Sequence, residues 1–175
     1  MSSYPSRKVL LETLRLWLRL PWWESTVIYG RDQNHSTPYL QTWSHGKLHV
    51  HRFFRGDADP DPHDHKWDYW TFPLVGYVEE VCVPHEMCGG LWEFENVEVP
   101  AFQLHYRRAE HCHRVMGPLQ GTGSIWTVVW TGPVRRDWGF QVGSTWVPWR
   151  TYVFGQRPDL CSKSTVLTPT HEVSP

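Results

Sequence analysis

The chain has 175 residues, of which 40% are hydrophobic and 20% are charged, and its formal net charge at pH 7 is -1. This length suits one domain that buries roughly 70% of its unfolded surface. A charge so close to zero argues against a protein whose main role is to coat nucleic acid or an anionic membrane. No apolar run reaches the roughly 18 residues of a membrane-spanning helix. The 12 tryptophans and 11 histidines exceed what an ordinary core needs.

Residues 6–20 carry the clearest helical pattern. Ser6 can cap the start of the helix and Pro21 ends it. Apolar side chains recur at helical spacing, at Val9, Leu10, Leu14, Trp17 and Leu18. We expect this apolar stripe to pack against a sheet or a partner subunit, although the basic opposite face would also suit a membrane surface. Residues 1–36 are therefore predicted to form a helical arm.

From residue 37 onward, short runs rich in Val, Trp, Tyr, Phe and Thr alternate with clusters of Gly, Pro and Asp. The predicted strands include 47–54, 67–75, 76–83, 124–132 and 146–154. Many short strands with frequent turns and almost no helix indicate a β-sandwich or barrel. Residues 37–157 are expected to form this domain, and the Ser-, Thr- and Pro-rich residues 158–175 a flexible tail.

The cysteines show no paired spacing of the kind that binds zinc; they are Cys82, Cys88, Cys112 and Cys161. The first twenty residues have no cleavage site of a signal peptide, and Arg15 and Arg19 interrupt their apolar stretch. We therefore expect reduced thiols and a cytoplasmic protein.

Two His-x-His pairs are the chemically distinctive feature of the sequence. Alternate residues of a strand point to one face, so His63 and His65 project together, as do His111 and His113. Neutral imidazoles bind divalent metals, and two such segments can supply the three ligands of an open metal site. The open positions would take water or substrate. The plainer alternative is an exposed pair on a polar strand.

The spacing of these residues resembles the cupin superfamily. The first cupin motif has a glycine, an H-x-H segment, a glutamate and a second glycine, which correspond here to Gly56, residues 63–65, Tyr69 and Gly76. The second motif resembles residues 108–113. In finer detail, the segments HDHKWDYWTFPLVGYVEE, RRAEHCHRV and GPVRRDWGFQ are similar to a group of small uncharacterised cupins of bacteria and phages.

This resemblance spans roughly residues 38–155. It implies an all-β, cupin-type double-stranded β-helix, which is a jelly-roll barrel, preceded by the N-terminal helix and with a metal site inside its mouth. It implies far less about the reaction, because one fold serves many chemistries.

The chain departs from the cupin pattern where Tyr69 replaces the usual glutamate ligand. The resemblance therefore reduces the metal ligands to His63, His65 and His113. Asp68 precedes Tyr69, and strand alternation would turn it away from the ligands unless the strand bends. We keep Asp68 as an orienting residue or an alternative fourth ligand.

Three neutral imidazoles leave the charge of a divalent ion uncompensated, so the site favours anionic ligands such as a thiolate, an enolate, a carboxylate or hydroxide. Fe(II), Zn(II), Ni(II) and Cu(II) all accept imidazole. Among cupins, three-histidine iron sites resemble those of thiol dioxygenases and of some ring-cleaving enzymes. We therefore favour Fe(II) and a small anionic substrate.

Three further side chains are predicted to act on the substrate. Tyr69 would donate a hydrogen bond to the substrate or to dioxygen, His51 would exchange a proton near pH 7, and Arg108 would pair with an anionic group. Alternatively, Tyr69 simply packs against its neighbours, His51 is a core histidine bonded to the backbone, and Arg108 is a solvated surface charge. Most of the tryptophans are expected in the core, with others at the mouth or in a dimer interface.

The first functional hypothesis is an Fe(II)-dependent oxygenase of a small anionic substrate. The second is a redox-neutral, metal-dependent isomerase or epimerase of a sugar or sugar nucleotide. The third is a non-catalytic cupin that binds a ligand. In each case the expected partner is a small molecule, with no nucleic acid and no membrane span, and a homodimer is an open option.

Overall fold

The computed structural model of the protein describes residues 6–29, 38–57, 59–84, 92–121 and 123–155. A helix, α1 (Arg7–Trp17), precedes the strands, and a second helix, α2 (Trp149–Phe154), follows them. The strands are β1 (Glu24–Ile28), β2 (Leu40–His45), β3 (Leu48–Phe53), β4 (Tyr69–Pro73), β5 (Tyr77–Pro84), β6 (Trp92–Val99), β7 (His105–Arg107), β8 (His113–Pro118), β9 (Ile125–Thr131), β10 (Gly139–Val142) and β11 (Thr145–Pro148).

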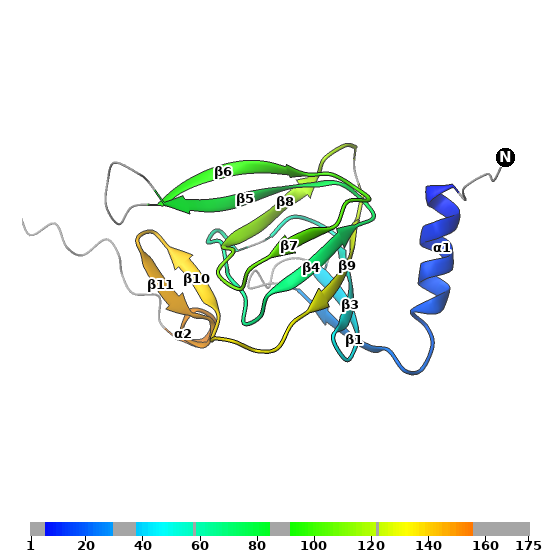
Figure 1. The fold of residues 1–175 in the computed structure, drawn as a ribbon, viewed down its shortest axis with the longest axis horizontal. Helices are drawn as coiled ribbons and strands as arrows, with labels where there is room; N and C mark the ends of the chain where they lie inside the picture. Colours follow the sequence, from blue (N-terminus) through cyan, green and yellow to red (C-terminus); the bar gives the residue numbers. More distant parts are fainter. Residues whose placement is uncertain (1–5, 30–37, 58, 85–91, 122, 156–175) are drawn as a thin grey trace, which may run out of the picture.

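Two antiparallel sheets form the body of the molecule (Figure 1). The larger sheet has the order β1-β2-β3-β9-β4-β7, and the smaller sheet has the order β6-β5-β8. His63 forms antiparallel bridges with His113 of β8 and with Phe140 of β10. The segment around His63 therefore continues the smaller sheet and joins it to the β10–β11 hairpin.

This pairing is that of a jelly roll. If β3 is counted as strand one and the His63 segment as strand two, one sheet has the order 1-8-3-6 and the other 2-7-4-5. Apart from β5 and β6, which pair within one sheet, consecutive strands thus alternate between facing sheets, as they do in a double-stranded β-helix. The predicted all-β, cupin-type barrel with an N-terminal helix is confirmed.

Alternation along β9 shows how the sequence builds the two faces. Thr127 and Val129 point into the barrel and line its cavity. Trp126, on the outer face, is only 1% exposed because it packs in a cluster with Val50 and Leu18, at the end of α1. Trp130 lies further along the same face and is 55% exposed. Helix α1 thus covers one part of the outer face and leaves another part open.

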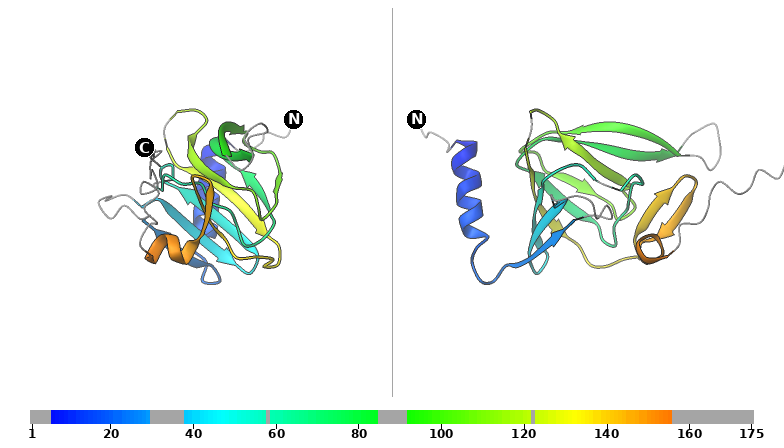
Figure 2. Two further views of the ribbon diagram at one scale, coloured as in Figure 1. Left: turned by 90° about the vertical axis from the view of Figure 1, so that its left-hand side faces the viewer. Right: turned by 180° about the vertical axis from the view of Figure 1, so that it is seen from behind.

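Helix α1 starts where the sequence predicts. The Ser6 hydroxyl accepts a hydrogen bond from the backbone N–H of Val9, and the helix ends at Trp17, earlier than expected. Leu11 and Leu14 pack against the outer face of the larger sheet. In Figure 1 and in the right-hand view of Figure 2, which shows the molecule from behind, α1 and the β10–β11 hairpin lie at opposite ends of the molecule. No helix within the described residues is long and apolar enough to cross a membrane.

The predicted strand at 146–154 is wrong in its second half. Pro148 ends β11 and provides the N-cap of α2, because a proline cannot donate to a continuing ladder. Helical spacing then places Tyr152 against Phe140, with ring centroids 3.8 Å apart. The four other predicted strands match β3, β4, β5 and β9 within two residues at each end.

The division into an arm, a barrel and a tail stays a prediction. Strand β1, inside the predicted arm, pairs with β2, so that Thr26 lies opposite Thr42. Residues 158–175 lie outside the described part of the chain.

Candidate metal centre

Three histidines from two distant segments converge at one end of the barrel interior. The backbone N–H groups of His63 and His113 each donate to the other's carbonyl oxygen across 2.9 Å, which sets the two chain segments side by side. One nitrogen from each of His63, His65 and His113 lies within 4.8 Å of the others. The Nε2 atoms of His65 and His113 are 3.1 Å apart. The structure thus brings together the three ligands that the resemblance implies.

These distances suit a divalent ion. Two nitrogens that each lie about 2.1 Å from one ion are about 3.0 Å apart in an octahedral arrangement and about 3.4 Å apart in a tetrahedral one. The 3.1 Å between His65 and His113 falls between these values. Two of the imidazoles, those of His65 and His113, are also held in the neutral form that binds metal. Burial, reinforced by the other histidines, holds the pKa of His65 well below its ordinary value, and burial lowers the pKa of His113.

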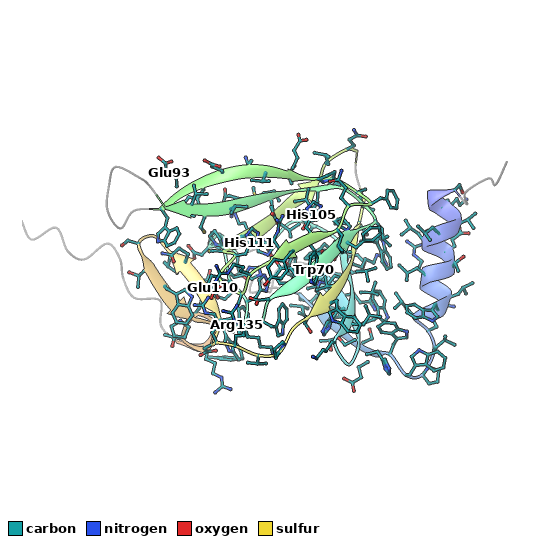
Figure 3. All side chains as sticks on the ribbon, viewed as in Figure 1. Trp70, Glu93, His105, Glu110, His111 and Arg135 are labelled. Carbon is teal, nitrogen blue, oxygen red and sulfur yellow. The ribbon has the colours of Figure 1, made fainter. Side chains whose placement is uncertain are left out.

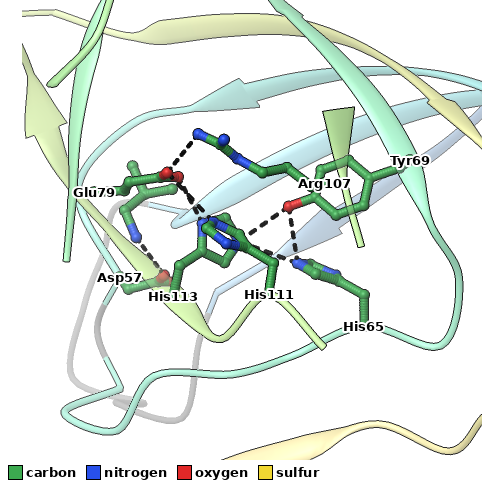
Figure 4. Close-up of polar contacts among 8 residues, drawn as sticks. Asp57, His65, Tyr69, Glu79, Arg107, His111 and His113 are labelled. Atoms are coloured by element: carbon green, nitrogen blue, oxygen red, sulfur yellow. Dashed lines mark hydrogen bonds and ion pairs between the residues drawn. The ribbon is translucent and has the colours of Figure 1, made fainter. Parts of the chain in front are cut away.

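A buried carboxylate orients His113 (Figure 4). Glu79 of β5 is fully buried, and its Oε2 accepts a hydrogen bond of 2.8 Å from Nδ1 of His113. Burial alone would raise the pKa of Glu79, but hydrogen bonds from His111 and His113 and the charge of Arg107 hold the pKa below its ordinary value. A carboxylate that binds Nδ1 leaves Nε2 free for a metal.

Glu79 lies outside both histidine motifs and was not among the predicted site residues. The signal that would have found it is a carboxylate at an inward position of a strand, since Tyr77 and Glu79 alternate with more exposed neighbours. A carboxylate is stable in a protein interior only if it is paired with a positive charge or with hydrogen-bond donors.

Glu79, His111 and His113 form a second group whose ligand atoms lie within 4.8 Å of one another. Arg107 donates a hydrogen bond of 2.7 Å to the Oε1 of Glu79, and Nε2 of His111 lies 3.3 Å from the same oxygen. A guanidinium beside this carboxylate already supplies the positive charge that a cation would bring. The group therefore fits a supporting role for His113 better than a metal site.

Tyr69 lies directly beside the ligands. Its hydroxyl oxygen is 3.3 Å from Nε2 of His65 and 3.5 Å from Nε2 of His113. Burial raises the pKa of Tyr69 well above its ordinary value, so the phenol keeps its proton. It is thus able to donate a hydrogen bond to a molecule bound at the three histidines.

His51 faces the same interior. Its side chain lines the cavity next to the three histidines, and burial, with a contribution from His49, lowers its pKa to about 4. The ring is neutral at pH 7 and can accept a proton.

Two predicted site residues lie elsewhere. Asp68 accepts a hydrogen bond of 2.8 Å from the backbone N–H of Ala109 and pairs with Arg135, so it ties two loops together outside the histidine cluster. Arg135 also lies 3.7 Å from Glu110, and both are labelled in Figure 3. The side chain of Arg108 is 70% exposed and lies 3.6 Å from Glu110.

An interior cavity of about 130 Å³ adjoins the three imidazoles. A wider groove of about 400 Å³ shares Tyr39, Leu40 and His63 with this cavity and extends to α2. The groove therefore lies next to the cavity, on the side of the β10–β11 hairpin.

No protein-family model and no curated protein matches the sequence. Among solved structures, hydroxypropylphosphonic acid epoxidase from S. wedmorenis is similar at 14% identity and a TM-score of 0.42, over 62% of this chain and 56% of that protein. A putative mannose-6-phosphate isomerase from Ralstonia eutropha JMP134 is similar at 14% identity and a TM-score of 0.40, over 57% and 89% of the two chains. A cupin domain from Bordetella pertussis Tohama I is similar at 15% identity and a TM-score of 0.37, over 65% and 96%.

The chain therefore spans little more than half the length of the epoxidase that it matches. These likenesses are too weak to carry an argument about activity. The assignment of a cupin-type fold rests on the strand order, and the candidate metal centre rests on its own geometry.

Proposed function

We propose that this chain is a metal-dependent enzyme, and specifically an Fe(II)-dependent oxygenase of a small substrate that binds through an anionic atom. The observation that carries the proposal is the convergence of three imidazoles, those of His63, His65 and His113, beside an interior cavity. Such ligands suit Fe(II) and leave its charge available to an anionic substrate atom. When bound, the ion would supply Lewis acidity and a position for dioxygen.

The protein's own groups would have distinct roles. Glu79 holds the ring of His113, the phenol of Tyr69 donates a hydrogen bond to a substrate atom, and His51 accepts a proton inside the cavity. An orienting role for Asp68 is supported by its hydrogen bond to the backbone of Ala109. Arg108 stays a prediction for the outer rim alone, because its guanidinium is exposed.

A redox-neutral isomerase is the second candidate, and the observation in its favour is the neutral imidazole of His51 in the same cavity. A proton shuttle needs such a base but needs no dioxygen. The two candidates therefore differ in whether dioxygen has a binding position at the metal. A non-catalytic cupin would need neither a base in the cavity nor a position for dioxygen at the metal.

The test starts with elemental analysis of protein purified without a tag, where we expect one iron per chain. Nitric oxide, added to the anaerobic Fe(II) protein as a surrogate of dioxygen, should give the EPR signal of a high-spin iron nitrosyl. His63→Ala should lose the metal, whereas His45→Ala should keep it, because His45 is an exposed histidine outside the cluster. Protein that binds no metal, or a metal that survives His63→Ala, would overturn the proposal.

A cytoplasmic location and a homodimer stay predictions. The dimer is supported by exposed aromatic side chains on the outer face of the larger sheet, where Trp70 and Trp130 lie in register and are 45% and 55% exposed. Aromatic residues of this kind are enriched in interfaces.

A further inference from the structure

The interior cavity beside the metal centre has no charged side chain among the described residues that line it. Its walls are mostly aromatic or aliphatic, and its polar groups are imidazoles and the hydroxyls of tyrosines and threonines. The imidazole of His51 is neutral at pH 7 because burial lowers its pKa to about 4. A substrate in this cavity therefore meets no permanent charge other than that of the metal.

The arginines near the second histidine segment do not reach this cavity. Arg107 lies 2.7 Å from Glu79, and Arg114 lies 2.8 Å from Glu80, so each guanidinium already has a carboxylate partner. Arg108 is exposed and pairs with Glu110. None of the three lines the cavity. A carboxylate or phosphate group on the body of a substrate would thus be buried without a partner, which is costly.

The size of the cavity limits the substrate further. Its volume is about 130 Å³. An apolar cavity of about 150 Å³ holds one benzene molecule, so a cavity of this size takes a substrate body of roughly five or six non-hydrogen atoms.

The groove next to the cavity favours the same kind of molecule. Its wall includes Trp138 and Trp149, whose rings are parallel within 10° and have centroids 5.6 Å apart. The charged side chains among its described lining residues are Asp57 and Asp59, and both are acidic. This groove favours a flat apolar molecule and repels one with several negative charges.

We infer that the site takes a small, apolar molecule that binds the metal through one ionisable group, such as a thiol or a phenol, and that carries no second charge. The inference rests on the proposed metal-dependent function and narrows its substrate class. It excludes phosphorylated sugars and amino acids, whose charged groups would find no partner in the cavity. The single ionised atom is acceptable because the metal neutralises it.

The test uses the full chain loaded with Co(II), whose visible spectrum reports on thiolate binding. Two probes, 3-mercaptopropanamide and 3-mercaptopropionate, have the same shape and differ by one charge. We expect the amide to bind about tenfold more tightly than the carboxylate at pH 8, since the cavity offers the carboxylate no partner. Benzenethiol, which matches the cavity in size, should bind more tightly than either.

Tighter binding of the carboxylate than of the amide, or equal binding of the two, would overturn this inference while leaving the metal site intact. Failure to bind Co(II) at all would instead overturn the proposed function. The two failures are distinguishable, because bound Co(II) has its own absorption bands before any thiol is added.

A cavity-filling variant tests whether benzenethiol binds in this cavity. Val129→Phe fills the cavity from β9 and should weaken benzenethiol binding about thirtyfold, by excluding the ring. Azide, a small anion that needs only the metal, should bind the Co(II) forms of the variant and the parent alike, which shows that the centre is intact. If Val129→Phe retains benzenethiol affinity, the ligand does not occupy this cavity; if the variant does not fold, the smaller Val129→Leu should show the same trend.

Discussion

Glu79 and His113 are joined by a hydrogen bond of 2.8 Å between Oε2 and Nδ1, inside the barrel and out of contact with water. The bond fixes the tautomer of His113 and turns Nε2 toward His65 and Tyr69. Glu79, which lies outside both cupin motifs, thus determines that Nε2 of His113 is the nitrogen available to a metal.

Replacing Glu79 tests this relationship. Glu79→Gln keeps the shape but removes the charge, and we expect metal affinity to fall about 10–100-fold, as it does when such outer partners are lost. Glu80→Gln is the matched control, because Glu80 pairs with Arg114 on the other face of the same strand. Competition with a chromophoric chelator measures both affinities. Equal affinity in the parent and in Glu79→Gln would show that the carboxylate does not support the metal.

Tyr69 offers a second test, since it stands where the cupin pattern has a glutamate. Tyr69→Glu should tighten Zn(II) binding severalfold, because an anionic oxygen is added beside the three imidazoles. Tyr69→Phe removes only the hydroxyl and should leave Zn(II) affinity nearly unchanged. Calorimetric titration of the three proteins gives the comparison. A large loss of affinity in Tyr69→Phe would make the phenol itself a ligand.

Stability should fall in mild acid through His51. Its pKa in the folded protein, about 4, is below the value of about 6.5 in an unfolded chain, so the unfolded state binds more protons between these pH values. Its contribution is therefore complete above about pH 6.5 and is lost as the pH falls toward 4. The loss is on the order of 3 kcal/mol. Urea unfolding of the metal-free protein at a series of pH values should show this slope, and His51→Gln should reduce it. His65 and His113, whose pKa values are also lowered, account for the part that remains.

Replacing the two tryptophans of β9 should change the free energy of unfolding by very different amounts. Trp126→Ala removes a side chain that is 1% exposed, so we expect a loss of about 3–5 kcal/mol in the free energy of unfolding. Trp130→Ala, on the same face but 55% exposed, should change it by less than about 0.5 kcal/mol. Equal losses from the two variants in urea unfolding would mean that α1 does not cover Trp126.

The thiols of Cys82 and Cys112 lie 2.8 Å apart on paired backbone, with the N–H of Cys82 bonded to the carbonyl of Cys112. Hydrogen peroxide should join them slowly, because the hydrogen bond from Cys82 and burial raise the pKa of Cys112 and keep its thiol protonated. One thiol is oxidised to a sulfenic acid as peroxide is reduced to water, and the second thiol then displaces water to form the disulfide. Peptide mass analysis should find the two peptides linked and two hydrogens lighter. Cys82→Ser should prevent the link, whereas Cys161→Ser should not, and an intact pair of thiols after oxidation would contradict the prediction.

Much of the fold could be predicted because strand and helix periodicities are local. The runs at 47–54 and 124–132 alternate in a way that only a strand uses, and they become β3 and β9. The prediction of a strand over 146–154 was wrong in its second half because the aromatic residues there suit both a strand and a helix. Packing of Tyr152 on Phe140, which lies on another element, decided for the helix.

Residue spacing alone is enough to place His63 and His65 on one face, His113 at the head of a strand, and a helix before a β-barrel. These properties depend only on the spacing of neighbouring residues. The three-dimensional fold, in contrast, is needed to bring the three rings together, to place Glu79 beside one of them and to leave Arg108 exposed to solvent. Each of these outcomes depends on which strands pair across long stretches of chain, and the spacing of neighbouring residues carries no record of that pairing.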